Sequence, residues 1–462
     1  MDAGVFVDGA HSLLPDHETV VSSAPWPLIP PVHRLPVELL SEIFIELSEA
    51  QVDQFEYKSE IRHIPHLMTI TVGSVCRRWR AVTRGTTAFW TFISVAKDTR
   101  HVAAYIDACT SSSGQQELHL FCGSEEFLSI FFSRLLPHSA RWASLNIHGG
   151  KAVDMAMLST GQYCFGALQV LHLSYVTMPQ GTWDFLASAP RLEEFRVYES
   201  SANNESAIIP PMSNLRTVEY HIFDIYHLST IFAAVAHSRE ALESLCIAFL
   251  SSPSDLEIGT PVVMPALKQL DLDHACQVFM KSIVAPNLEE LVNGYPDFEL
   301  SAPELVFAMI SHPQADPYSL RCLELNSLYI LDEEDSQILL RCLARMVNVE
   351  VLHLSYHSDQ DDAPHLSDAL LTGLSLAKHH GVPPILPCLR RLYFNLEPFL
   401  SDDELARQRR LLVEVVRSRV TPQILGGHAY AALRSFASDV ECPELGPKFK
   451  QWQTFGHTYL GE

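Results

Sequence analysis

The sequence has few of the features that mark an enzyme or a metalloprotein. It contains no G-x-G-x-x-G or Walker-type phosphate loop, no G-x-S-x-G nucleophile turn and no H-E-x-x-H zinc helix. Its 10 cysteines are spread along the chain, and even the closest two, Cys109 and Cys122, do not form a C-x-x-C pair. Isolated cysteines are usually small buried hydrophobes. We therefore expect no catalytic residues, no cofactor, no metal site and no disulfide framework.

The chain also lacks long apolar runs and an excess of positive charge. No segment approaches the roughly 18 consecutive apolar residues of a membrane span, and Asp2 and Asp8 stand where a signal peptide needs basic residues. The 32 Lys and Arg residues are outnumbered by 55 Asp and Glu, for a net charge of −23, which argues against a general nucleic-acid or anionic-membrane binder. We expect a cytoplasmic or nuclear protein with no nucleic-acid, membrane or small-molecule partner.

The composition nevertheless predicts a well-packed interior. Of the 462 residues, 47% are hydrophobic and 19% are charged, which suits one large or two modest domains. The first 30 residues end in a cluster of prolines that includes Pro25, Pro27 and Pro30. Residues 1–30 are therefore predicted to form a flexible lead.

Two short segments near the N-terminus carry apolar residues at helical spacing. Pro36 suits the first turn of a helix, where its missing N–H costs nothing. The apolar residues that follow are Leu39, Leu40, Ile43, Phe44 and Leu47, and a second segment repeats the spacing at Val75, Cys76, Trp79 and Val82. A unit this short cannot bury two such stripes within itself. The rest of the chain or another protein should therefore cover at least part of one stripe.

These segments resemble the F-box, the small helical module that docks a substrate receptor onto the Skp adaptor of cullin-RING ubiquitin ligases. The L-P-x-E-[LI]-L-x-x-I-F opening and the V-C-[RK]-x-W-[RK] continuation both match, and Phe89-Trp90-Thr91-Phe92-Ile93 is similar to the family's closing segment. The resemblance implies an F-box over residues 31–80 that binds a Skp-type adaptor and, through it, a cullin. The implied adaptor-binding residues are Leu35, Pro36, Leu39, Leu40, Ile43, Phe44, Leu47, Val75, Cys76 and Trp79.

Residues 48–66 depart from the family pattern, because they lengthen the gap between its two halves. A longer gap is similar to that of divergent fungal F-box-like proteins. The alternative interpretation is an ordinary helical hairpin at the N-terminus of a larger domain.

From about residue 140 onward the sequence repeats an L-x-x-L-x-L phrase. Clear copies begin at Trp142, Leu168, Leu192, Leu215, Leu242, Leu267, Leu320, Val349 and Leu389, with a truncated copy at Leu288 and a weak one at Leu433. The copies from Trp142 to Leu288 start 21 to 27 residues apart, and the later ones need insertions. Each phrase predicts a short strand. Several intervening stretches predict helices, at residues 224–237, 303–311, 334–346, 366–379 and 402–420.

Stacked units of this kind resemble the irregular leucine-rich repeats of fungal F-box proteins. The resemblance implies an α/β fold in which an N-terminal all-helical F-box precedes a leucine-rich-repeat-like α/β solenoid, or horseshoe. The solenoid would span residues 141–445, after a linker at 81–140 with a first strand near 116–121, and residues 446–462 would cap its end. The Asn or Cys ladder of regular repeats is replaced by Tyr175, Glu199 and Ile222. A doubly wound α/β domain is the alternative fold.

The whole chain thus resembles a substrate-recognition subunit of an SCF-type ubiquitin ligase, which has no chemistry of its own. The concave strand positions would bind a target protein whose identity the sequence does not reveal. Those positions carry His172, Arg196, Glu219, Asp271, Glu324, His353 and Tyr393. Two alternatives stay open, namely a ligase-independent F-box and leucine-rich-repeat scaffold and an enzyme of unknown class.

Overall fold

A computed structural model describes most of the chain. It covers residues 31–52, 66–97, 99–159, 162–176, 182–198, 212–222, 232, 235–249, 261–274, 279–296, 302–316, 319–326, 333–355, 367–376, 385–395, 401–425, 427–438, 440 and 442–445. The predicted lead at residues 1–30 and the predicted cap at 446–462 lie outside these residues.

The described residues form one large parallel sheet whose 13 strands follow one another in sequence order. The strands are β1 (Phe92–Val95), β2 (Leu118–Cys122), β3 (Trp142–Gly150), β4 (Val170–Val176), β5 (Glu194–Tyr198), β6 (Thr217–Ile222), β7 (Ser244–Phe249), β9 (Gln269–His274), β11 (Glu290–Pro296), β12 (Cys322–Leu325), β13 (Val351–Ser355), β14 (Arg391–Asn395) and β17 (Ser435–Ser438). The predicted α/β class is confirmed, and every repeated phrase contains a strand. The order of these strands lacks the reversal that defines a doubly wound sheet.

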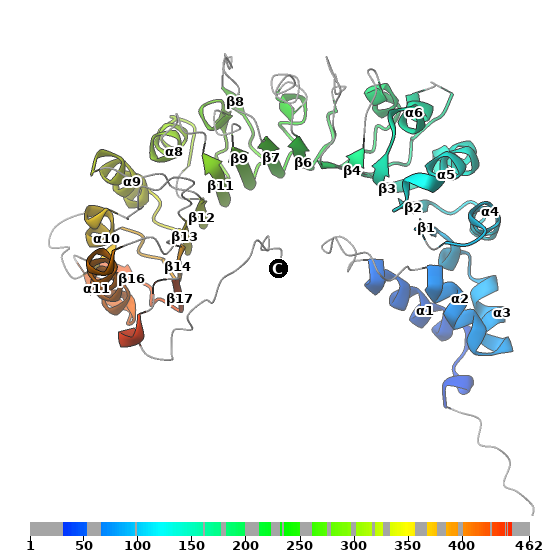
Figure 1. Cartoon of the computed structure of the whole chain (residues 1–462), viewed down its shortest axis with the longest axis horizontal. Coiled ribbons are helices and arrows are strands. Elements are labelled where there is room, and N and C mark those ends of the chain that lie inside the picture. The colour runs from blue at the N-terminus through cyan, green and yellow to red at the C-terminus, as the bar shows by residue number, and fades with distance from the viewer. Residues whose placement is uncertain are drawn as a thin grey trace, which may run out of the picture.

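Helices cover one face of this sheet. They are α4 (Val102–Ser112), α5 (Leu128–Leu135), α6 (Ala152–Met155), α8 (Ala302–Ile310), α9 (Glu333–Arg345), α10 (Asp368–Leu374) and α11 (Asp402–Arg419). Figure 1 shows a curved body, which we call the arc (residues 92–445), with the strands on its inner side and the helices on its outer side. The helices predicted at 303–311, 334–346 and 402–420 are confirmed by α8, α9 and α11, whereas most of 224–237 lies outside the described residues.

Short elements complete the arc. They are the 3-10 helices η3 (Glu125–Phe127), η4 (Leu136–Arg141), η5 (Ala156–Ser159), η6 (Thr182–Ser188) and η10 (Pro443–Leu445), and the strand pairs β8 (Val262–Val263) with β10 (Ile283–Val284) and β15 (Gln423–Leu425) with β16 (His428–Tyr430). None of the helices in the part of the chain that the structure describes is long and apolar enough to cross a lipid bilayer.

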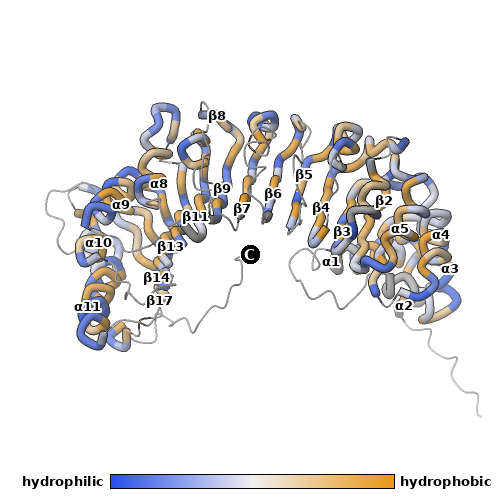
Figure 2. The backbone as a smooth tube through the Cα atoms, turned by 45° about the horizontal axis from the view of Figure 1, so that its top comes forward, coloured by the Kyte–Doolittle hydropathy of each residue, from blue (hydrophilic) through white to orange (hydrophobic). Residues whose placement is uncertain are grey.

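The register of the sheet stacks one core residue from each strand into a continuous row. This row is Ile93, Leu120, Leu145, Leu171, Phe195, Val218, Leu245, Leu270, Leu291, Leu323, Leu352, Leu392 and Phe436. Every member is at most 5% exposed and belongs to one apolar core. Figure 2 shows the hydrophobic residues recurring along the strands through the arc. Each unit buries its apolar face against its neighbours, so the arc is one cooperative body.

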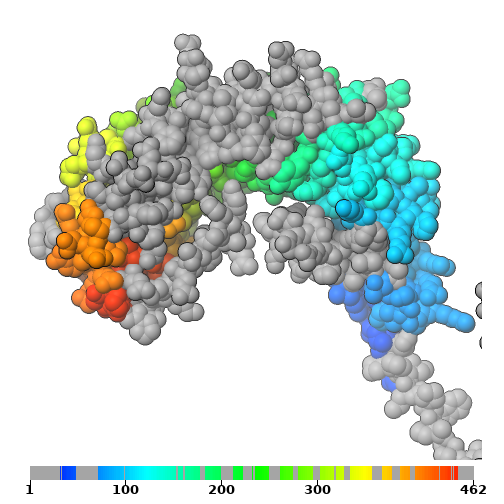
Figure 3. Space-filling model, in the orientation of Figure 1, coloured from blue at the N-terminus to red at the C-terminus, as the bar shows by residue number. Residues whose placement is uncertain are grey.

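A second, smaller core lies at the N-terminal end of the arc. The helices α1 (Val37–Val52), α2 (His66–Val75) and α3 (Arg77–Gly85) and the 3-10 turn η2 (Thr87–Trp90) form a helical unit, preceded by η1 (Pro31–Arg34). Its buried residues are Leu40, Phe44, Val72, Val82 and Phe89. Figure 3 shows this unit in blue at one end of the arc, with the C-terminal elements in orange and red at the other.

The border between the two cores differs from the sequence-based boundary. The segment Phe89–Ile93 resembles the family's closing segment, but its last two residues, Phe92 and Ile93, belong to β1, the first strand of the sheet, which pairs with β2. Ile93 and Val95 are both 0% exposed within the arc's core. Trp90 packs against both cores, and its Nε1 donates a hydrogen bond to the carbonyl of Thr83 at 2.8 Å. The sheet therefore begins well before residue 140.

Candidate functional site

Helix α1 carries two neighbouring apolar rows with opposite surroundings. Leu40 and Phe44 are 1% and 3% exposed and form the core of the helical unit. Leu39, Ile43 and Leu47 follow each other at four-residue steps and are 45%, 43% and 47% exposed. Residues four apart lie on one helix face, so these three form a continuous apolar strip on the surface.

The predicted adaptor-binding residues thus divide into two groups. Leu35, Leu40, Phe44 and Trp79 pack inside the helical unit, where the rings of Phe44 and Trp79 lie 4.9 Å apart. Cys76 has a structural role as well, because its Sγ accepts a hydrogen bond from the backbone N–H of Trp79 and caps α3. The exposed residues are Pro36, Leu39, Ile43, Leu47 and Val75, and Val37 is a further exposed apolar residue of α1. Leu40 and Phe44 are buried, so they can support a binding surface only from within, whereas Leu35, Cys76 and Trp79 keep part of their surface exposed.

The concave face of the sheet gathers the other predicted residues. The register aligns one concave residue from each strand in the order Ser94, Phe121, Asn146, His172, Arg196, Glu219, Cys246, Asp271, Val292, Glu324, His353, Tyr393 and Ala437. All the predicted target-binding residues lie in this row, which we call the concave row. The phrase spacing placed them correctly because each occupies the same position between two core residues.

Ion pairs connect the first half of the concave row. His172 Nε2 donates to Glu194 Oε1 at 2.7 Å, and Arg196 Nε lies 2.7 Å from the same oxygen and 3.5 Å from Glu219 Oε2. Burial alone would raise the pKa of Glu194, but the hydrogen bond from His172 and the charge of Arg196 outweigh it and hold this pKa below its ordinary value. These side chains therefore form one connected network.

The network continues into a group of acidic, imidazole and thiol side chains. His221 Nε2 lies 3.1 Å from Glu219 Oε1 and 3.6 Å from Cys246 Sγ. Cys246 in turn shares a hydrogen bond with Asp271. Burial and the nearby charge of Asp273 raise the pKa of Asp271 to about 7, which indicates a site where negative charge accumulates.

A separate polar cluster occupies the second half of the concave row. His353 Nδ1 lies 3.2 Å from Glu324 Oε1, and Asn326 Nδ2 donates to the same oxygen at 2.8 Å. The Tyr393 ring packs edge-on against His353 at 5.9 Å. Asp271 and Glu324 are both partly buried and hydrogen-bonded.

A second surface feature runs along the edge where the strands begin. Eight successive strands each contribute one charged residue of alternating sign, in the order Glu193, Arg216, Glu243, Lys268, Glu289, Arg321, Glu350 and Arg390. Lys268 Nζ lies 2.6 Å from Glu243 Oε2, and Arg321 Nη1 lies 3.8 Å from Glu350 Oε1. The hydrogen bond from Lys268 holds the pKa of Glu243 below its ordinary value. We call this line of side chains the charge row.

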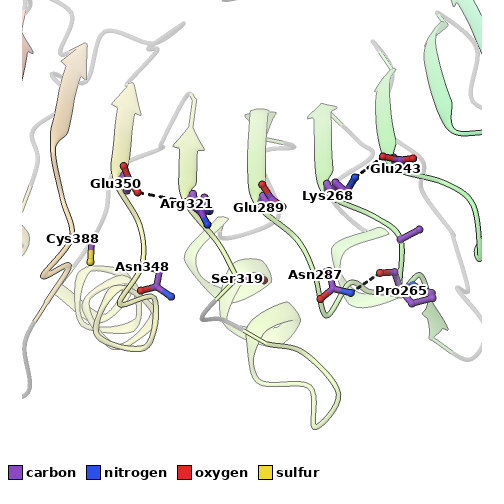
Figure 4. A pocket seen from close by; sticks show the side chains of 11 residues that line it. Glu243, Pro265, Lys268, Asn287, Glu289, Ser319, Arg321, Asn348, Glu350 and Cys388 are labelled. Carbon is purple, nitrogen blue, oxygen red and sulfur yellow. Dashed lines mark hydrogen bonds and ion pairs between the residues drawn. The ribbon is translucent and has the colours of Figure 1, made fainter.

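Part of the charge row lines an open groove of about 600 Å³. Figure 4 shows Glu243, Lys268, Glu289, Arg321 and Glu350 side by side at the start of their strands, above a second line of residues that includes Asn348, Ser319 and Asn287. Asn287 Nδ2 donates to the carbonyl of Pro265 there at 2.8 Å. Opposite charges pair across this edge, so the groove has no charge of one sign with which to select a ligand.

The comparisons with known proteins add no relative. No protein-family model matches the chain, and no curated protein sequence is significantly similar to it.

Proposed function

We propose that the chain is the substrate-recognition subunit of an SCF-type ubiquitin ligase. The helical unit binds a Skp-type adaptor, and through it a cullin, with the exposed strip of α1. The arc is a leucine-rich-repeat-like solenoid that binds a target protein. In this role the chain has no catalytic residue of its own, and it brings the target to the ubiquitin-conjugating partner.

The observation that carries the proposal is the exposed apolar strip of Leu39, Ile43 and Leu47, each more than 40% exposed. Val37 and Val75 are further exposed apolar residues of the helical unit, at 49% and 56% exposure. Contiguous exposed apolar residues mark binding surfaces in soluble proteins. The strip lies on the segment whose sequence resembles the F-box, and that module binds its adaptor through an apolar helical face.

The concave row supports the second half of the proposal. Its side chains lie on a rigid parallel sheet, which holds them in fixed relative positions. Acidic, basic, imidazole and phenolic groups are interspersed along the row from His172 to Tyr393, with Cys246 and Val292 among them. A polar partner surface with mixed charges fits this row better than a uniformly acidic or basic one.

The test is capture of a purified Skp-type adaptor by the full-length chain. The Leu39→Ala/Ile43→Ala variant removes two exposed side chains and leaves the core residues Leu40 and Phe44 in place. Loss of a large apolar anchor typically costs about 2 kcal/mol, which is roughly 30-fold in Kd. We expect the double variant to bind the adaptor at least about 30-fold more weakly.

A matched control removes two exposed apolar residues elsewhere. Ile130 on α5 and Phe307 on α8 are 40% and 39% exposed, so Ile130→Ala/Phe307→Ala should leave adaptor binding unchanged. Equal capture by wild type and by the folded Leu39→Ala/Ile43→Ala variant would contradict the proposal. Adaptor binding without cullin association would favour the ligase-independent scaffold.

A further inference from the structure

Three side chains on the concave face converge as metal ligands do. Glu219 Oε1 lies 3.1 Å from His221 Nε2, and Cys246 Sγ lies 3.6 Å from the same nitrogen. The carboxylate oxygen, the imidazole nitrogen and the sulfur all lie within 4.8 Å of one another. We propose that Glu219, His221 and Cys246 bind a zinc ion. This inference does not depend on adaptor binding.

The distances among these atoms suit a tetrahedral ion. Zinc binds sulfur at about 2.3 Å and nitrogen or oxygen at about 2.0 to 2.2 Å, which places neighbouring ligand atoms about 3.4 to 3.6 Å apart around a tetrahedron. The 3.6 Å between Cys246 Sγ and His221 Nε2 matches this spacing. The 3.1 Å between Glu219 and His221 is a few tenths of an ångström short of it, so only small side-chain adjustments are needed.

The register of the sheet brings the proposed zinc ligands together. Glu219, Cys246 and Asp271 are direct neighbours on β6, β7 and β9, and adjacent strands lie about 4.8 Å apart. His221 stands two residues beyond Glu219, so it projects from the same face of β6. The hydrogen bond between Cys246 and Asp271 holds the Asp271 carboxyl group beside the sulfur.

Neighbouring side chains hold the proposed ligands in place. Arg196 Nε lies 3.5 Å from Glu219 Oε2, which is the oxygen that does not face His221. The Tyr198 hydroxyl donates a hydrogen bond to Glu219, and the Tyr198 ring stacks on His221 at 5.0 Å with an interplanar angle of 20°. Zinc ligands are typically oriented by such partners, which fix the position of the imidazole and carboxylate groups.

The donor set selects the metal. Thiolate and imidazole suit zinc, whereas magnesium and calcium take oxygen ligands. Three protein ligands leave one position of the tetrahedron open to a water molecule or another group. A bound ion would join the adjacent strands β6 and β7 near the middle of the arc.

The experiment titrates metal-free, full-length protein with Zn²⁺ alone and, separately, with Co²⁺. We expect one equivalent of zinc to bind and to raise the melting temperature, and Co²⁺ to give a thiolate-to-cobalt charge-transfer band. Cys246→Ser should abolish that band and weaken zinc binding by more than about 100-fold, since loss of a mere supporting partner costs roughly 10- to 100-fold. His221→Gln should weaken zinc binding as much. Excess Mg²⁺ should not compete.

Matched controls test whether other thiols and histidines contribute to zinc binding. Cys164→Ser removes an exposed cysteine, and His353→Gln removes a concave histidine that also pairs with a glutamate; both should bind zinc as wild type does. Circular dichroism of each metal-free variant confirms that it is folded. Failure to bind one equivalent of zinc, or binding that survives both Cys246→Ser and His221→Gln, overturns the proposal and leaves these side chains as hydrogen-bonded pairs only.

Discussion

Regularly spaced apolar side chains are buried in the arc but partly exposed on α1 of the helical unit. In the arc, Leu245, Leu270 and Leu291 stack on one another and are 1%, 1% and 0% exposed. In α1, Leu39 and Ile43 recur just as regularly but are 45% and 43% exposed. A strand of the arc has a neighbour on each side, whereas α1 packs along one side only. Regular apolar spacing therefore shows that a face is apolar but does not show what covers it.

Truncating the chain between the helical unit and the arc should have the largest effect on stability. A chain that starts at residue 96 loses β1 with Ile93 and Val95, whereas one that starts at residue 86 keeps it. Burying each of these side chains stabilises the fold by about 1.5 to 3 kcal/mol, and loss of β1 also exposes β2 as a new edge strand. We expect the shorter chain to be at least about 3 kcal/mol less stable in denaturant unfolding, or to aggregate. Equal stability would place β1 with the helical unit.

Replacing the neighbouring leucines Leu39 and Leu40 of α1 should give the next largest difference in stability. Leu40→Ala leaves a cavity in the small core and should cost about 2 to 4 kcal/mol. Leu39→Ala changes only the surface and should stay within about 0.5 kcal/mol. Thermal unfolding of both variants measures the difference. Similar losses at the two positions would mean that the outer row is covered within the chain itself.

The concave row should respond to pH through Glu324. Burial alone would raise the pKa of Glu324, but its hydrogen bond with His353, the electrostatic attraction of His353 and the hydrogen bond from Asn326 together outweigh burial and hold the pKa below its ordinary 4.5. The ionised form is therefore stabilised by folding, and this contribution is present above pH 4.5 and lost as the pH falls through the lowered value. Glu324→Gln should cost about 1 kcal/mol at neutral pH and little in acid.

Unfolding measured from neutral to acidic pH tests this prediction. Glu126→Gln removes an exposed carboxylate and controls for the change in net charge. A constant gap between wild type and Glu324→Gln across the whole pH range would show that the ionisation of Glu324 does not contribute to stability.

The smallest effect should come from the charge row. Arg216 lies 3.6 Å from Glu193 and 3.2 Å from Glu243, so Arg216→Glu would place three acids in succession. Exposed pairs of this kind contribute less than about 1 kcal/mol each. We expect a modest loss of stability in dilute buffer that shrinks in high salt, because salt screens exposed charges. A loss that is insensitive to salt would point to a packing defect instead.

The sequence was sufficient where one local rule decides the structure. Each repeated phrase marked a strand because its core residues must face one side, as Leu267, Leu270 and Leu272 do around β9. Helix α11 could be placed to within one residue, because Ser401 and Glu404 form a capping box at its start. The charge row has a sequence signature that was not used, since its members always follow the first apolar residue of a phrase.

The sequence was insufficient where neighbouring elements decide. Leu39 and Leu40 are equally apolar, and only the packing of α3 and η2 on one side of α1 separates them. The same limit applies to His221 and Cys246, which are 25 residues apart in the chain. A search for closely spaced cysteines could not find them, because they meet only through the register between β6 and β7.

The alternation of the charge row constrains how the arc can change length. Deleting the one unit that carries Glu243 would bring Arg216 beside Lys268 and put two positive charges in contact. Deleting two adjacent units would keep every junction between unlike charges. Between Glu193 and Arg390, an even number of neighbouring units can therefore be inserted or deleted without placing like charges side by side, whereas an odd number cannot. This holds although each unit folds around the same apolar phrase.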